Sequence, residues 1–436
     1  MLSGKARRPA ARETDFSLRL TYVVWALVLF VPEWWLASFG LGPLKRLGLL
    51  LFPIAAGVAF LRPTGLPVHW PLLLWVAFHA MWVASPFVSN RGYAMEVFKI
   101  ELLFYVFLIA LPAAVIRESR RAVPMIIMFL LSFGWWALHG LPDGKVGWHS
   151  TLGNEDGFGP IMVVGIAFAS FVALGARSRR ARLASVAVAV SCGIGIVASF
   201  ARGAVLAAGV VLVALWLRSP RKAAMLGWVL LAAAVMVVAS AVLFPGGAFW
   251  DEMRTIGDGF DDPTGSDRRD LWKAGWRVFL RSPLVGVGPA NFGAYASENF
   301  AFGEAQGFYG DPGHFYGRSL HNIYFQILSE QGLIGVAIFL FLLKDFVSRN
   351  RALRTRQAGE HWAAATGAPV SLGFVSLGLE TAMLGYLASG FFYDQLYETS
   401  LYAIVALNLL LHSLVTSRAR SGSPAAALAR SEVRRS

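Results

Sequence analysis

The sequence has few charged residues and only one cysteine. Asp, Glu, Lys and Arg together make up 15% of its 436 residues, whereas hydrophobic residues make up 56%, and the mean hydropathy is +0.56. A soluble protein of this length could not bury so much apolar surface, so the composition predicts a membrane protein. The single cysteine, Cys192, excludes an intramolecular disulfide framework.

Motifs for binding metals and nucleotides are also missing from the sequence. The histidines are scattered, there is no HExxH motif or Cys/His cluster, and acidic pairs such as Glu155-Asp156 give only weak support for a divalent cation. GVGP at 286–289 lacks the third glycine and the flanking strand and helix of a dinucleotide fingerprint, so we interpret it as a loop. No metal and no cofactor is therefore predicted.

The basic residues are divided among the segments between apolar runs. The formal net charge of +13 would suit a nucleic-acid-binding protein, but there is no basic stripe with interleaved aromatic residues, so nucleic acid is not a predicted partner. A bilayer core requires about 20 apolar residues of helix. By this measure the predicted spans are 20–39, 47–61, 70–89, 94–116, 122–141, 158–176, 183–201, 203–217, 224–245, 322–343, 367–392 and 396–416. The predicted fold class is an all-α polytopic membrane protein with about 12 transmembrane helices.

The charges that flank these spans predict their orientation. RSRRAR and RSPRK flank the region 183–217 and should lie on the same side, so we expect a hairpin at Arg202 and Gly203. With the N-terminus in the cytoplasm, both termini and most Lys and Arg are cytoplasmic. The opposite short loops hold only Lys45, Arg46, Arg91, Lys145 and Arg202. No removable signal peptide is predicted.

This topology divides the chain into segments with different predicted roles. They are a cytoplasmic tail (1–19), transmembrane helices 1–9 (20–245), a periplasmic loop domain (246–320), transmembrane helices 10–12 (321–416) and a disordered cytoplasmic tail (417–436).

The long outer loop contains the helix signature SDRRDLWKAGWRVFLRSP. We expect Asp267 to cap this helix, Trp272 and Trp276 to lie on an apolar face, and Ser282-Pro283 to end the helix. Such an amphipathic helix would lie on the membrane surface or cover the end of the bundle.

Arginines gather on the outer side, where the positive-inside rule gives no reason for them. They are Arg202, Arg268, Arg269, Arg277, Arg281 and Arg318. Because the guanidinium fork binds phosphate oxygens in pairs, this cluster suits a phosphate or pyrophosphate at the membrane surface. Two other interpretations stay open, since Arg202 can snorkel to the interface and the loop arginines can pair with neighbouring acidic residues.

A histidine and a polar stripe precede and open the predicted span 322–343. His321 follows the arginine-bearing loop, where a neutral imidazole could take a proton from a sugar or lipid hydroxyl, although a structural role at the helix end is also open. Asn322, Gln326 and Glu330 are spaced four residues apart and must face the bundle interior. There they would line a cavity or form interhelical hydrogen bonds.

A few further polar residues are weaker candidates for the same cavity. These are Lys99, Glu101, Glu380, Tyr393 and Asp394. They would either line the cavity or pair with one another.

Three motifs, in this order, resemble those of the O-antigen ligases and polymerases of bacterial envelopes. SFARGA at 199–204 resembles the family's arginine-glycine turn at an outer helix end. RRDLWKAGWRVFLRSPLVGVGPANF at 268–292 resembles its periplasmic loop signature. SLHNIYFQILSEQGLIG at 319–335 resembles the block that follows, with its histidine and its Glu-x-Gly.

The resemblance implies a GT-C-like, metal-independent glycosyltransferase of the bacterial inner membrane. It would take a glycan from undecaprenyl diphosphate on the periplasmic face and transfer it to the lipid A core, with membrane lipids around it. Carried over to the matching positions, Arg202 and Arg268, or Arg269 beside it, would hold the diphosphate, and His321 would be the base or would orient the acceptor. Independently of the resemblance, Arg318, Asn322, Gln326 and Glu330 are the residues that could line the cavity. Direct displacement by the acceptor hydroxyl would invert the anomeric centre.

Other functions remain compatible with the same sequence. A polymerase would use a second lipid-linked glycan as acceptor, and a protein O-glycosylation ligase would use serine or threonine; no residue distinguishes them. From a different class, a secondary transporter or lipid flippase would show two matching halves with broken helices, whereas the polar residues here collect on one side and in one loop.

Overall fold

The chain folds into a bundle of helices. The structure, a computed structural model, describes residues 9–30, 73–78, 108–142, 155–220, 222–258, 263–300 and 315–421. Within these ranges the chain forms helices and loops, with an isolated bridge between Ala176 and Val370 and no strand. The predicted all-α class is therefore confirmed.

Seven helices in the described ranges are long and apolar enough to cross a membrane. They are α6 (Ser119–Gly140), α7 (Glu155–Gly175), α8 (Arg179–Ala198), α10 (Lys222–Leu243), α15 (Ile323–Leu353), α17 (Leu372–Ser389) and α18 (Thr399–Ser421). Helix α9 (Arg202–Arg218) corresponds to the predicted span 203–217. Helix α1 (Pro9–Phe30) covers 20–30 of the predicted span 20–39 but begins before it, and 31–39 lie outside the described residues.

The structure does not confirm the predicted count of about 12 spans. The predicted span 47–61 lies outside the described residues, and only 73–78 and 108–116 are described from the predicted spans 70–89 and 94–116. A hairpin between α8 and α9 is present, but its turn lies at 199–201, and Arg202 and Gly203, where the turn was predicted, begin α9. Helix α15 continues well past the predicted end at 343, where an ion pair between Asp345 and Arg349 joins successive turns.

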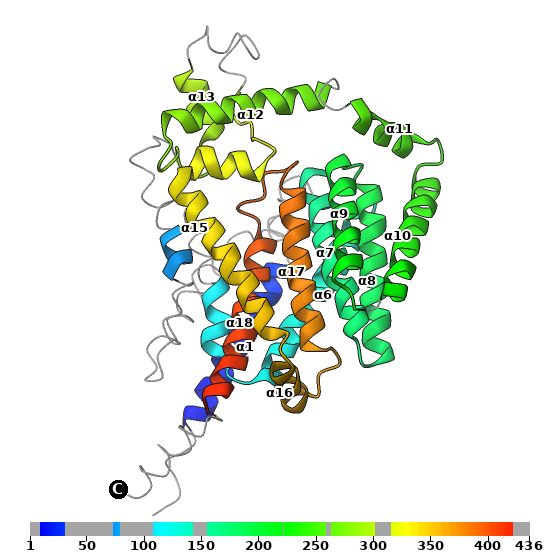
Figure 1. The fold of residues 1–436 in the computed structure, drawn as a ribbon, viewed down its shortest axis with the longest axis vertical. Helices are drawn as coiled ribbons and strands as arrows, with labels where there is room; N and C mark the ends of the chain where they lie inside the picture. Colours follow the sequence, from blue (N-terminus) through cyan, green and yellow to red (C-terminus); the bar gives the residue numbers. More distant parts are fainter. Residues whose placement is uncertain are drawn as a thin grey trace, which may run out of the picture.

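The two ends of the bundle carry different short helices (Figure 1). One end, called here the α12 end, holds α11 (Ala248–Arg254), η2 (Thr255–Asp258), α12 (Pro263–Arg281) and α13 (Phe292–Asn299). The other, the α16 end, holds α16 (Arg356–Thr366). Helices α11, α13 and α16 are not among the predicted elements, because they are too short and too polar to resemble spans.

Basic segments meet at the α16 end. The backbone N–H of Arg177 donates to the Pro369 carbonyl (2.6 Å), and Arg120 Nε donates to the Ala365 carbonyl at 2.8 Å. Arg218, at the end of α9, pairs with Glu380 of α17. The flanks of the α8–α9 hairpin therefore return to one end, as their charges predict.

Helix α7 occupies the centre of the bundle, between α8 and α17 (Figure 1). Its Phe158, Phe168 and Phe171 are fully buried. Helix α10, by contrast, lies at the edge and exposes large apolar side chains such as Leu230 and Val242. An apolar helix with so little protein contact is what a lipid-facing position requires.

Helix α12 lies across its end of the bundle, against α15 and α13 (Figure 1). The prediction that Asp267 caps it is wrong, because the helix begins at Pro263, a residue whose fixed φ suits the first helical position. The predicted stop at Ser282-Pro283 is confirmed. Leu271, Ala274 and Val278 form its buried face, whereas Trp276 of the predicted apolar face is exposed.

Candidate active site

Each of the three sequence motifs contains a residue in a left-handed backbone conformation. Among the described residues, positive φ outside glycine occurs at Phe200 (54°), Ala290 (54°) and His321 (47°). Such residues cost about 1–3 kcal/mol each and cluster at functional sites. Their positions favour a functional role for all three turns.

His321 forms a tight turn immediately before α15. The next residue, Asn322, is the N-cap, and its Oδ1 accepts the backbone N–H groups of Tyr324 (2.9 Å) and Phe325 at 3.1 Å. Its Nδ2 donates to the carbonyl of Phe391 (2.9 Å), and the N–H of Ile323 donates to the carbonyl of Gly390 at 2.7 Å. The turn that presents His321 is thus anchored to the connection between α17 and α18.

That connection, the 390–398 segment, also contacts the other two motifs. The Arg268 guanidinium lies 5.7 Å from the centroid of the Tyr393 ring, at cation–π distance. Ser319 Oγ donates to Asp394 Oδ1 at 3.1 Å. Gly203, beside Arg202, is so close to Phe392 that an added Cβ would lie 2.5 Å from the Phe392 Cβ. The structure therefore brings the three motifs together on Phe392, Tyr393 and Asp394. Tyr393 and Asp394 were only weaker candidates from the sequence.

Arg202 reaches α11 and η2 from the start of α9. Its Nη1 donates to Thr255 Oγ1 (2.5 Å), its Nε lies 3.3 Å from Glu252 Oε1, and 18% of its side chain is exposed. Arg318 likewise pairs with Asp267 of α12. Arg318 therefore pairs with an acidic residue, which is the alternative that the sequence left open for the loop arginines. Arg202 pairs with an acidic residue as well. A diphosphate would have to share Arg202 with Glu252.

Arg268 and Arg269 point in different directions, since consecutive helical residues are about 100° apart around the axis. Arg268 is partly buried and faces Tyr393. The Arg269 side chain is 46% exposed, its Nε lies 3.8 Å from Asp270 Oδ1, and it lines a groove together with Trp272, whereas Arg268 does not line that groove.

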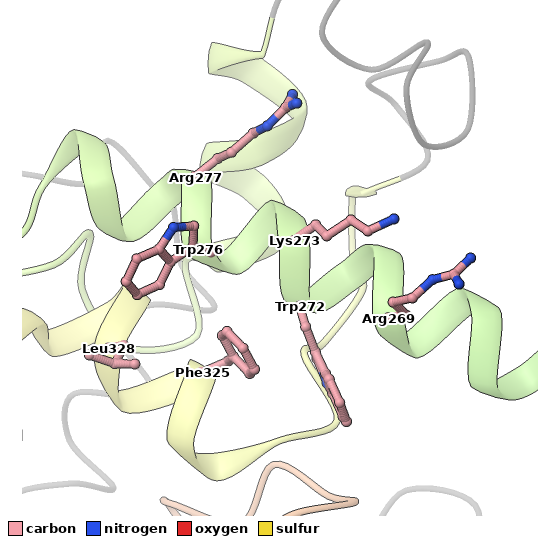
Figure 2. Close-up of a pocket in the computed structure, with 7 residues that line it drawn as sticks. All are labelled: Arg269, Trp272, Lys273, Trp276, Arg277, Phe325 and Leu328. Atoms are coloured by element: carbon pink, nitrogen blue, oxygen red, sulfur yellow. The ribbon is translucent and has the colours of Figure 1, made fainter. Parts of the chain in front are cut away.

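The groove runs between α12 and the first turns of α15. Its volume is about 800 Å³, and its lining is Arg269, Trp272, Lys273, Trp276, Arg277, Phe325 and Leu328. Figure 2 shows Trp272 and Trp276 pointing from α12 toward Phe325 and Leu328, whereas the cationic side chains leave α12 away from the tryptophans. The Trp272 ring stacks on Phe325, with centroids 5.6 Å apart, and its Nε1 donates to the carbonyl of Leu320 at 3.0 Å.

The polar stripe on α15 is buried, as its helical spacing predicts. Asn322, Gln326 and Glu330 are 1%, 5% and 4% exposed. The backbone N–H of Leu396 donates to Gln326 Oε1 (3.4 Å), and the Tyr397 hydroxyl donates to the Glu330 carboxylate. Burial, with Glu330 beside it, raises the pKa of Tyr397 well above its ordinary value, so this phenol stays protonated and remains the donor. The stripe therefore makes structural hydrogen bonds, and each of its residues has one to the 390–398 segment. Asn322 also caps α15, and the Glu330 carboxylate also accepts from the backbone of Ala290 and Phe292, in the second motif.

A backbone junction joins the second and third motifs. Helix α15 is broken at Gly332 (φ 63°), and the loop after α12 fits into the break. The N–H groups of Val287 and Gly288 donate to the carbonyls of Ser329 (2.9 Å) and Glu330 (2.8 Å), and those of Leu333 and Ile334 donate to Pro283 (2.8 Å) and Leu284 at 3.1 Å. A Cβ on Gly286 would lie 2.3 Å from the Glu330 carbonyl carbon, and one on Gly332 would lie 2.5 Å from that of Leu284. The two glycines are thus required by close backbone approach and by positive φ. GVGP is a loop, as predicted.

Glu380 lies away from these motifs, at the α16 end. It pairs with Arg354 and, at 3.5 Å, with Arg218. Of the two roles considered for this residue, pairing is the one observed. Lys99 and Glu101 lie outside the described residues.

The acidic and histidine side chains of the described residues form no group of three or more that could hold a metal ion. Metal independence stays a prediction for the reaction assay.

This fold and site define a polytopic, all-helical membrane protein with a polar, conformationally strained site at one end of its bundle. The family model described as O-antigen ligase matches residues 187–340, a segment that contains all three motifs. This segment belongs to the O-antigen ligase and polymerase family, which confirms the resemblance predicted from the sequence. The match supports a membrane glycosyltransferase-like enzyme with ligase-type or polymerase-type activity. No curated protein matches the chain.

Proposed function

We propose that the protein is an O-antigen ligase, which transfers a glycan from undecaprenyl diphosphate to the lipid A core on the periplasmic face of the inner membrane. The observation that supports it most directly is the convergence of the three family motifs on three consecutive residues, Phe392, Tyr393 and Asp394. A reaction between two lipid-linked substrates needs its charged groups at one membrane surface, and α12, which carries Arg268, lies across one end of this bundle (Figure 1).

In the proposed reaction, the arginines stabilise the leaving group. The acceptor hydroxyl attacks the anomeric carbon, the sugar–phosphate bond breaks, and its electron pair stays on the diphosphate. Arg268 lies over Tyr393 in the 390–398 segment where the three motifs meet, called here the motif junction. It binds the diphosphate as the charge of the leaving group develops, and Arg202 assists from the start of α9.

His321 takes the proton of the acceptor hydroxyl or orients that hydroxyl. Its left-handed turn places it next to Ser319, whose hydroxyl is bonded to Asp394, and within one residue of the N-cap of α15. A positioned base of this kind accelerates a proton transfer by roughly 10²–10⁴. Displacement by a single attack inverts the anomeric centre.

The test is glycan transfer by purified protein in nanodiscs, with a chelator present throughout. The donor is an undecaprenyl-diphosphate-linked glycan, and separate reactions contain the lipid A core, a second lipid-linked glycan, or a peptide with serine and threonine. We expect transfer to the lipid A core, with an inverted linkage in the NMR spectrum of the product. Transfer only to the lipid-linked glycan would instead establish a polymerase, and transfer only to the peptide would establish a protein ligase. If no acceptor receives the glycan, the proposed glycosyltransferase activity is rejected.

A further inference from the structure

Helix α12 presents positive charge in two directions. Arg268 faces Tyr393 at the junction of the motifs, whereas Arg269, Lys273 and Arg277 line the groove beside Phe325. The three groove cations are four residues apart, so they form a row of about 12 Å along one side of the helix. A row of this length matches a ligand with more than one negative charge.

The groove combines this charge with aromatic surface. Trp272 and Trp276 extend beneath the cations toward Phe325 (Figure 2). Trp276 is 46% exposed, and the apolar residues that follow it, Leu280 and Leu284, are exposed as well. Exposed tryptophan beside exposed leucine is typical of a helix at the membrane interface, where an aromatic face can stack on sugars or on the upper part of a lipid.

The Trp272 side chain contacts both the groove and the motif junction. Its ring lines the groove and also packs edge-on against Phe391, while its Nε1 binds the carbonyl of Leu320, the residue before His321. A ligand in the groove therefore contacts a side chain that is bonded to the residue directly before the proposed base. The proposed reaction needs an acceptor at this place, since its donor diphosphate is assigned to Arg268.

We infer that the groove binds the phosphorylated sugars of the acceptor glycolipid, with phosphates on Arg269, Lys273 and Arg277 and sugar rings on Trp272 and Trp276. This inference rests on the proposed function and extends it to a second substrate site. Two glycolipids share the required chemistry, namely a phosphorylated lipid A core and a second diphosphate-linked glycan.

The variants Arg277→Glu and Trp276→Ala test the groove, because both side chains are exposed and neither belongs to the proposed catalytic machinery. Arg254→Glu on α11 is the matched control, with the same change of charge at the α12 end on a residue that does not line the groove. We expect both groove variants to raise the KM for the acceptor about tenfold, with kcat and the KM for the donor unchanged, and the control to behave like the wild type. Phosphatase treatment of the lipid A core should raise the KM of the wild type for this acceptor, and it should change the KM of Arg277→Glu little further.

Equilibrium binding without donor separates this inference from the proposed function. Lipid A core, its phosphatase-treated form and a lipid-diphosphate-linked glycan are each titrated into wild-type protein, Arg277→Glu and Arg254→Glu, and binding is followed by thermophoresis. Phosphate-dependent binding that only Arg277→Glu weakens would support the groove even if no transfer occurs, and the glycolipid that binds identifies the source. A rise in the donor KM, an equal effect of Arg254→Glu, or unchanged acceptor binding in the groove variants would overturn the inference.

Discussion

Both ends of the bundle contain ion pairs, but only the α12 end adds cations beside aromatic rings and open space and a histidine in a left-handed turn. At the α16 end, Glu380 joins Arg218 of α9 to Arg354 at the end of α15, and the Asn350 side chain accepts the Ser376 hydroxyl at 3.0 Å. At the α12 end, Arg268 lies over an aromatic ring, His321 adopts a left-handed conformation, and Arg269 borders an open groove.

The comparison shows that a buried charge alone does not identify an active site in a membrane protein. In an ion pair that links helices, the charges are already satisfied by their own partners, so they are less available to a substrate. A site that binds and reacts keeps cations near open space and holds strained turns that the surrounding packing must support. The predictions below separate these two kinds of polar cluster.

The largest effect is expected at His321. We expect His321→Ala to lower kcat by roughly 10²–10⁴ without unfolding the protein, because the acceptor hydroxyl loses its base. His321→Asn is the matched variant, since asparagine tolerates the left-handed conformation but cannot act as the base. Transfer rates with a thermal melt check both, and a fully active Asn variant would show that only the turn, and not the imidazole, is needed.

At the α16 end, we expect Glu380→Ala to lower stability and leave the chemistry intact. Its removal leaves Arg218 and Arg354 without their shared carboxylate, which should cost roughly 3 kcal/mol. The melting temperature should fall, while the transfer rate of the folded protein stays at the wild-type value. If transfer is lost while the melting temperature is unchanged, Glu380 has a role in the reaction, and the polar cluster at the α16 end is not purely structural.

The neighbours Arg268 and Arg269 should differ in their effects on the donor. Arg268→Ala is expected to lower kcat/KM for the lipid-linked donor roughly 10²-fold, because a charge-assisted contact to the leaving group is lost. Arg269→Ala should leave donor kinetics unchanged, since its side chain faces the groove. Initial rates at varied donor concentration measure both, and equal losses would mean that the two faces of α12 bind one substrate.

The smallest effect is expected at the backbone junction that supports the α12 end. Gly332→Ala places a Cβ at positive φ and against Leu284, so we expect a loss of roughly 1–3 kcal/mol in stability. Gly359→Ala on α16 is the control, because an added Cβ there meets no atom within 4 Å. Thermal unfolding compares the stability of the two variants. An equal change in both would show that the backbone at the junction adapts to the added Cβ without a loss of stability.

The sequence by itself determined the membrane class, the all-helical fold and most of the span boundaries. These depend on hydropathy and on residues close together in the chain, so α7, α8, α9 and α10 fall within a few residues of their predicted ranges. The burial of Glu330 followed from its four-residue spacing to Gln326 in an apolar helix, and the three motifs were sufficient to recognise the family.

Only the tertiary structure decided how the motifs meet. The contact between Ser319 and Asp394 joins residues 75 positions apart, and no local pattern marks Tyr393 as the ring beneath Arg268. The different directions of Arg268 and Arg269 depend on the rotation of α12 about its axis, which packing against α15 fixes. The close approach of Gly286 to the break at Gly332 likewise depends on the tertiary structure. A glycine in a sequence does not reveal which other segment of the chain packs against it.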